Sequence, residues 1–72
     1  METLDLHGLR YEKVDRLVEN FVLTQSLPVK IITGNSHTMR SIVWDVVNRN
    51  NLGWSYESFH NLGAIVVYDS PI

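Results

Sequence analysis

The spacing of hydrophobic residues along the chain predicts two helices. In residues 11–25 the apolar positions recur at intervals of three and four, which places them along one side of a helix. These positions are Val14, Leu17, Val18, Phe21 and Val22. A second helix is predicted from about Ser36 or His37 to Asn50. Its apolar stripe consists of Met39, Ile42, Val43, Val46 and Val47. We expect the segment NRNNLG, with Gly53, to end this helix, because asparagine and glycine accept the backbone geometry of helix ends.

Four other segments have the pattern of short strands. TLDL (3–6) is closed by a His-Gly pair, and VKIIT (29–33) is rich in β-branched residues and follows Pro28, which blocks continuation of the first helix. WSYESFH (54–60) alternates large and polar side chains, as a half-buried strand does. AIVVY (64–68) follows a turn signal, NLG. The predicted order is therefore β-α-β-α-β-β.

This order predicts an α/β (α+β) two-layer sandwich that spans residues 1–72 as a single domain. Strands that alternate with helices imply parallel pairing through right-handed crossovers. Two helices cover one face of a four-stranded sheet better than both, so we expect the other face to be partly open. A hydrophobic content of 44% and a charged content of 19% agree with a globular chain.

Composition limits the cellular compartment and the classes of partner that we expect. The chain has no cysteine, which favours a reducing, cytoplasmic location and leaves no thiolate for a metal site. No apolar run is long enough for a membrane span, and the start METLDL lacks the features of a signal peptide, so we expect no membrane partner. The formal charge of −2 counts against a broad nucleic-acid-binding surface, but not against a local one.

Two polar segments, LDLHGLR (4–10) and TGNSHTMR (33–40), contain the ends of the first two predicted strands and the residues after them. The carboxyl ends of parallel strands lie along the same edge of a sheet, where ligand sites gather. Asp5 and His7 are two residues apart and share one face of their strand, whereas the neighbouring leucines share the other. An aspartate beside a histidine can fix its tautomer and raise its basicity. The pair is therefore a candidate orienting acid and general base.

The second segment offers a candidate phosphate site. Gly34, Asn35 and Ser36 turn directly into a helix, and Ser36 is a plausible N-cap. Free N–H groups and the positive dipole end make a helix N-terminus suited to an anion. His37 in the first turn and Arg40 one turn later would face the same anion, and Arg10 ends the first segment as Arg40 ends the second.

Simpler interpretations exist for each of these residues. Gly8 can serve only to permit the turn into the helix, and a serine-capped strand–Gly–helix turn is more often architecture than a phosphate site. We assign the aromatic residues Trp54, Tyr56, Phe59 and Tyr68 to core packing rather than to base stacking. His60 is interpreted as incidental, and Glu57 has no partner that the sequence identifies.

The residues LDLHGLRYEKVDRLVENFV resemble the opening of the Smr (small MutS-related) domain, in which a strand ends in Leu-Asp-Leu-His-Gly before an amphipathic helix. IITGNSHTMR is similar to the family's second motif in its Thr-Gly-x-Gly branch, with His37 at the nearby histidine and Met39-Arg40 where Leu-Arg stands. HNLGAIVVY resembles the final turn and strand. The chain departs from the family at Ser36, which replaces the usual second glycine, and at Thr33, where histidine is common.

The resemblance implies a fold similar to the C-terminal domain of translation initiation factor 3 and binding of DNA or RNA, with endonuclease or nicking activity. It implies catalytic roles for Asp5, His7 and His37. The residues that it assigns to the phosphate or the nucleic acid are Gly8, Arg10, Thr33, Gly34, Asn35, Ser36 and Arg40. Metal dependence stays open, because Asp5 offers a ligand to Mg²⁺ but one carboxylate alone holds this ion poorly.

Two alternatives stand beside the endonuclease. One is a non-catalytic module that binds branched or single-stranded nucleic acid through the same edge, which the altered second motif and the negative charge favour. The other is an interaction domain that docks on a partner protein through its open sheet face. A protein partner could also direct a free-standing endonuclease to its target.

Overall fold

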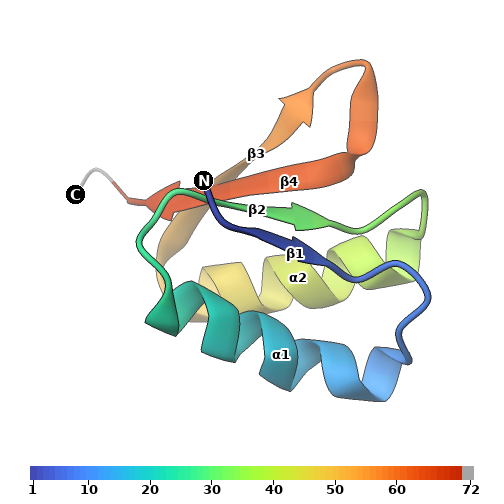
Figure 1. The fold of residues 1–72 in the computed structure, drawn as a ribbon, viewed down its shortest axis with the longest axis horizontal. Coiled ribbons are helices and arrows are strands. Elements are labelled where there is room, and N and C mark those ends of the chain that lie inside the picture. Colours follow the sequence, from blue (N-terminus) through green and yellow to red (C-terminus); the bar gives the residue numbers. More distant parts are fainter. Residues whose placement is uncertain (71–72) are drawn as a thin grey trace.

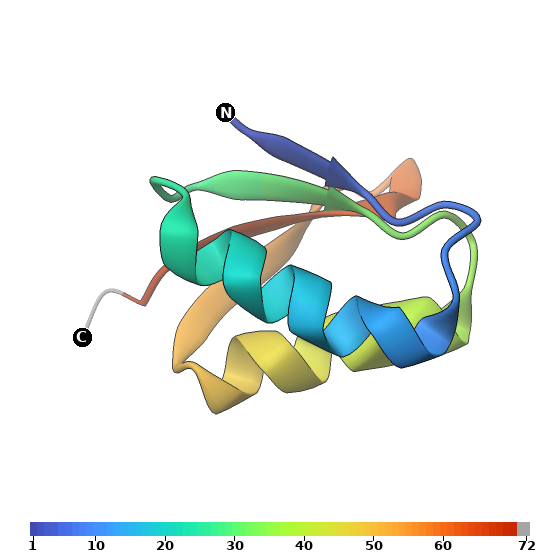
Figure 2. The same cartoon turned by 60° about the horizontal axis from the view of Figure 1, so that its bottom comes forward.

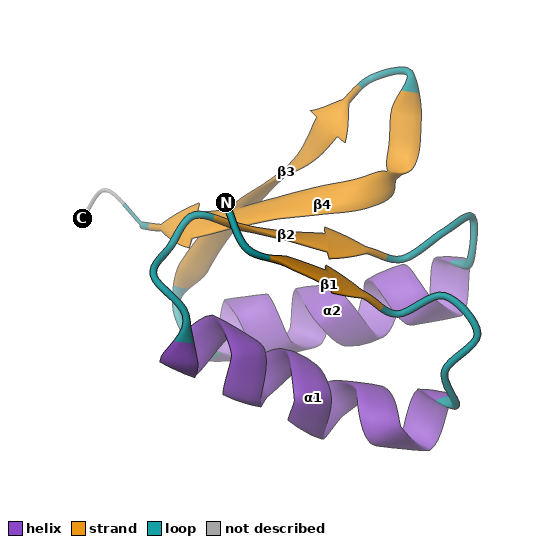
Figure 3. Ribbon diagram, in the orientation of Figure 1, coloured by secondary structure: helices purple, strands orange, loops and turns teal. Residues whose placement is uncertain are grey.

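The computed structural model describes residues 1–70, which form two helices and four strands. In chain order they are β1 (Thr3–Asp5), α1 (Tyr11–Thr24), β2 (Val29–Ile32), α2 (His37–Arg49), β3 (Leu52–Ser58) and β4 (Asn61–Asp69). The predicted order β-α-β-α-β-β is confirmed. Both helices lie on one side of the sheet (Figures 1 and 3), so the molecule is a small two-layer α+β domain.

The four strands form one mixed sheet in the order β1-β2-β4-β3. β1 and β2 are parallel neighbours, whereas β4 runs antiparallel to both β2 and β3. The carboxyl ends of β1 and β2 therefore meet at one edge of the sheet. Each strand leads directly into a helix, so α1 and α2 also begin at this edge (Figure 2).

The core lies between the sheet and the two helices. Branched aliphatic side chains dominate it, in agreement with the predicted stripes. Its fully buried members include Leu6, Val14, Val18, Val29, Ile31, Val43, Val46, Val47, Ile65 and Val67. Trp54 and Tyr56 of β3 are half-buried and pack against this core, as the sequence predicted.

The other face of the sheet carries an ion pair that spans three strands. Lys30 Nζ on β2 lies 2.7 Å from Glu57 Oε2 on β3, and β4 runs between these two strands. This contact is the main reason that the pKa of Glu57 is lowered below 4.5. This partner of Glu57 was not predictable from the sequence, because the two residues are 27 positions apart.

Two turn assignments made from the sequence are wrong. Gly53 does not end α2, because it lies within β3, where the ring of Tyr68 covers it and leaves no room for a Cβ. The asparagines of NRNNLG do end the helix, as predicted, because Asn50 is its C-cap and Asn51 follows with a φ of 57°. Asn61, Leu62 and Gly63 are the first residues of β4, and the hairpin turn consists of Phe59 and His60.

None of the helices within residues 1–70 is long and apolar enough to cross a membrane.

Candidate functional site

The structure brings the two polar segments to one edge, formed by residues 5–11 and 33–40 and called the strand-end edge below. Asp5 is in register with Ile32, and the Leu6 N–H donates to the Ile32 carbonyl at 2.9 Å. The hydroxyls of Tyr11 and Ser36 lie 3.0 Å apart and join the first residue of α1 to the cap of α2. The expectation that the segments are neighbours is thus confirmed, and Tyr11 is a contact residue that the sequence did not single out.

The first segment is largely a turn. Leu6 is buried in the core, and its carbonyl accepts from the Leu9 N–H at 3.1 Å. Gly8 has a φ of +80°, a conformation that glycine adopts without strain. Asp5 Oδ1 accepts from the backbone N–H of His7 at 2.9 Å. The carboxylate therefore fixes the turn through the His7 backbone, and no hydrogen bond joins it to the His7 ring within residues 1–70.

The end of β2 is fastened to β4 by its backbone. The N–H groups of Thr33 and Gly34 both donate to the Gly63 carbonyl, at 2.8 and 3.1 Å. The buried hydroxyl of Thr33 lies 3.3 Å from the same oxygen and 3.0 Å from the Gly34 carbonyl. A Cβ at Gly63 would lie 3.2 Å from the Gly34 carbonyl carbon, so the two glycines permit a close backbone approach. The Thr33 and Gly34 amides assigned to phosphate are thus engaged within the protein.

Arg40 also contacts the backbone of this edge. Its Nη1 lies 3.3 Å from the Gly34 carbonyl and 3.4 Å from the Leu62 carbonyl. These hydrogen bonds are long and therefore weak, so they orient the half-buried guanidinium without fixing it firmly. Arg40 therefore links α2 to the start of β4.

Ser36 is the N-cap of α2, as predicted. Its hydroxyl accepts from the Met39 N–H at 3.0 Å. Helix geometry leaves the N–H groups at the start of a helix without partners inside the helix. Those of His37 and Thr38, which follow the exposed Asn35 in the chain, therefore have no partner inside the helix and lie at the strand-end edge.

The exposed polar side chains of the edge include two imidazoles and a guanidinium. His7 and His37 are exposed, and the ring of His37 lies edge-on to Trp44 at 6.4 Å between centroids. Arg10, whose side chain is 81% exposed, lies 3.7 Å from a Glu12 oxygen. An ion pair at this distance in water is weak, so Arg10 is accessible to a second anion.

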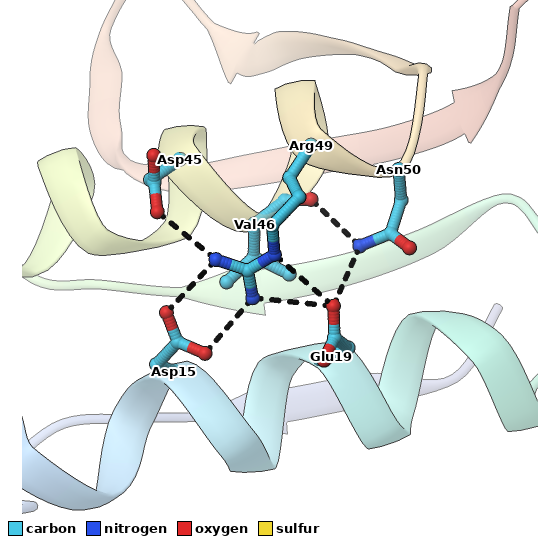
Figure 4. A network of polar contacts seen from close by, with 6 residues as sticks. All are labelled: Asp15, Glu19, Asp45, Val46, Arg49 and Asn50. Carbon is cyan, nitrogen blue, oxygen red and sulfur yellow. Dashed lines mark hydrogen bonds and ion pairs between the residues drawn. The ribbon is translucent and has the colours of Figure 1, made fainter.

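Much of the acidic charge is gathered at the other end of α2. Arg49 lies within 3.1 Å of Asp15, Glu19 and Asp45 (Figure 4). Asn50 donates to the same Glu19 oxygen, and this bond, followed by the bond from Arg49, lowers the pKa of Glu19 below 4.5. Three of the chain's eight acidic residues thus surround one arginine. The strand-end edge is correspondingly less acidic than the net charge suggests.

The strand-end edge does not form a magnesium site by itself. Within residues 1–70 no group of three or more histidine, aspartate or glutamate side chains is placed to hold a metal ion. Asp5 is the carboxylate that the resemblance offers to Mg²⁺, and one of its oxygens already accepts from the backbone.

Comparisons with protein-family models, with curated proteins and with solved structures found no match to this chain.

Proposed function

We propose that this protein binds nucleic acid along the strand-end edge and cleaves a phosphodiester bond there. The observation that carries the proposal is the convergence of His7, Arg10 and His37, all exposed, from two segments more than twenty residues apart. Further support comes from the element order, which agrees with the fold that the Smr resemblance implies, similar to the C-terminal domain of translation initiation factor 3.

In the proposed reaction the two imidazoles transfer protons. His7 accepts the proton of the attacking water or sugar hydroxyl, and His37 donates a proton to the leaving oxygen. Imidazole suits both roles because its ordinary pKa lies near neutrality. The new bond forms between the attacking oxygen and phosphorus as the bond from phosphorus to the leaving oxygen breaks.

Arg10 and the first N–H groups of α2 would hold the phosphate during this reaction. They are the cationic and amide donors of the edge that the structure leaves accessible. Fixed donors aimed at the phosphate oxygens stabilise the charge that develops in the transition state. Asp5 acts indirectly in this scheme, because it fixes the turn that presents His7.

A second candidate is a module that binds nucleic acid without cleaving it. Three contacts favour the binding module. Asp5 accepts a hydrogen bond from the backbone N–H of His7 and none from its ring. Gly34 and Arg40 each donate a hydrogen bond to a backbone carbonyl of β4. In this case the strand-end edge would bind phosphates, and the histidines would contact the nucleic acid without transferring protons.

The test is incubation of the pure protein with end-labelled single-stranded RNA, branched DNA and supercoiled DNA, with and without Mg²⁺. His7→Ala and His37→Ala run in parallel with Leu23→Ala, a matched control on the exposed face of α1 near its far end. We expect the two histidine variants to lose at least about a hundredfold in cleavage rate, the usual contribution of acid–base catalysis. All variants should keep the wild-type melting temperature, since both histidines are exposed.

Cleavage by the wild type and by Leu23→Ala, but not by the histidine variants, supports the endonuclease. Retarded migration of a substrate without cleavage supports the binding module. Equal cleavage by all variants removes His7 and His37 from the chemistry and contradicts the proposed mechanism. If the protein neither binds nor cleaves any of these substrates, docking on a partner protein is the remaining alternative.

A further inference from the structure

The most exposed aromatic residue of the described chain is at the tip of the β3–β4 hairpin. Phe59 is 86% exposed, in contrast to Trp54 and Tyr56 of the same strand region, which are half-buried. The expectation that Phe59 packs in the core is therefore wrong. Its ring lies beside that of His60, with 4.6 Å between centroids. The turn thus presents two adjacent rings to solvent.

Several polar contacts hold this turn in a defined shape. The Asn61 N–H donates to Ser58 Oγ at 3.1 Å, and its side-chain amide donates to Glu57 at 3.2 Å. Asn61 Oδ1 in turn accepts from the Gly63 N–H at 3.1 Å. Glu57 is itself paired with Lys30 on β2. The exposed phenyl ring is therefore carried by an organised turn that is anchored to the sheet.

The hairpin tip lies at the same end of the molecule as the strand-end edge, as Figures 1 and 2 both show. Arg40 reaches the Leu62 carbonyl, and the Gly63 carbonyl accepts from the end of β2. Phe59 is three residues from Leu62, so the two Cα atoms are at most about 10 Å apart. A chain bound along the edge therefore passes within reach of the ring.

We propose that Phe59, with His60 beside it, is a stacking platform for an unpaired nucleobase, and that the protein's nucleic-acid ligand is single-stranded. This inference rests on the proposed nucleic-acid binding and names its substrate class. A planar, solvent-exposed aromatic ring stacks on any base, whatever its sequence. Bases of an intact duplex are stacked on one another and do not present a face to such a ring.

The strand would follow the edge with its phosphates near Arg10 and the start of α2, while one base turns onto Phe59. Proteins that bind single strands without sequence preference use the same two kinds of contact: cationic groups contact the backbone, and aromatic rings stack on the bases. An acidic net charge is compatible with it, because stacking supplies affinity that does not depend on phosphate neutralisation.

The experiment measures fluorescence anisotropy of a labelled single-stranded DNA decamer, the same decamer as a duplex, and the same strand with abasic sites. The proteins are the wild type, Phe59→Ala, Phe59→Trp, Arg10→Ala and the control Leu23→Ala, which also removes an exposed apolar side chain. We expect Phe59→Ala to weaken single-strand binding by about ten- to a hundredfold, the range of base–aromatic stacking. Phe59→Trp and Leu23→Ala should bind like the wild type.

On the abasic strand, the wild type and Phe59→Ala should have the same Kd, because the base that stacks is gone. Equal single-strand binding by the wild type and Phe59→Ala overturns the stacking platform. If Arg10→Ala alone raises the Kd, the proposed binding along the strand-end edge still stands. Preference of the wild type for the duplex also overturns the inference. Absence of binding to all of these DNA probes overturns the inference as well, and the proposed function is then decided by its own test, which includes RNA.

Discussion

At the scale of single residues, Ser36 has two structural roles. Its hydroxyl caps α2 through Met39 and meets the hydroxyl of Tyr11, so it joins the two segments of the strand-end edge. Ser36→Ala should lower the free energy of unfolding by about 1 kcal/mol, the usual cost of a lost N-cap. Ser36→Asp should keep most of the stability because aspartate also caps helices.

Urea denaturation followed by circular dichroism measures these differences. Tyr11→Phe is the matched variant, since it removes the contact between the two hydroxyls and leaves the cap. We expect it to cost less than Ser36→Ala. A larger loss for Tyr11→Phe would contradict the assignment of the cap as the main role of Ser36.

The sequence predicts some residue roles well and others poorly. Ser36 was predictable because a cap depends on the next three residues only. The engagement of Thr33 and Gly34 was not, because their acceptor, Gly63, is about thirty positions away. The contact that Asp5 makes depends on the geometry of a turn, which the alternation of apolar and polar residues does not encode.

At the scale of elements, hydrophobic spacing predicted every helix and strand but not all of their ends. Gly53 has the composition of a helix stop, yet it lies inside β3, where the ring of Tyr68 covers it. NLG reads as a turn, yet its asparagine supports the preceding turn from inside β4. The ring of Tyr68 at Gly53, and the backbone pairing of Gly63 with Thr33 and Gly34, override the local preference of glycine.

The network between α1 and α2 predicts how stability depends on pH. Asn50 first and Arg49 second lower the pKa of Glu19 from 4.5 in the folded protein. The folded state thus binds this proton less readily than the unfolded state. The stability gained is fully present above about pH 4.5 and is lost as the pH falls through the lower, folded-state pKa. The melting temperature should therefore fall as the pH falls through this window.

Arg49→Gln removes one of the two groups that lower this pKa, along with the ion pairs to Asp15 and Asp45. We expect a lower Tm than the wild type at neutral pH, and a difference between the two that becomes smaller as the pH falls through the lowered pKa of Glu19. Thermal melts across this range measure the effect. Arg16→Gln, which changes an exposed arginine outside the network, should follow the wild-type curve; a difference from the wild type that does not vary with pH would argue against the linkage.

At the scale of the whole molecule, charge is distributed unevenly. Acidic side chains gather around Arg49, whereas the strand-end edge carries Arg10 and Arg40 with two histidines. Net charge is therefore a poor guide to where an anion binds. The order of strands and helices predicted that the segments carrying Arg10 and Arg40 meet, and the parallel pairing of β1 with β2 brings them to one edge.

This distribution predicts a weak dependence of single-strand binding on salt. Each phosphate neutralised on a single strand contributes about −0.7 to the slope of log K against log salt concentration. With few accessible cations, the slope should be shallow, and Arg10→Ala should reduce its magnitude by about 0.7. Anisotropy titrations at several salt concentrations measure it. Arg16→Ala removes the same charge from the middle of α1 and should leave the slope unchanged; an equal change in both variants would contradict a local site.

Both tryptophans of the chain belong to one aromatic cluster between α2 and β3. The rings of Trp44 and Trp54 are 5.1 Å apart, and Trp44 also meets the edge of the His37 ring. Two indoles this close couple their electronic transitions, and a neighbouring imidazole quenches indole emission when it is protonated. The intrinsic fluorescence of the protein therefore originates next to the first turn of α2. Occupation of the strand-end edge can be followed as a change in that emission, without a label on either partner.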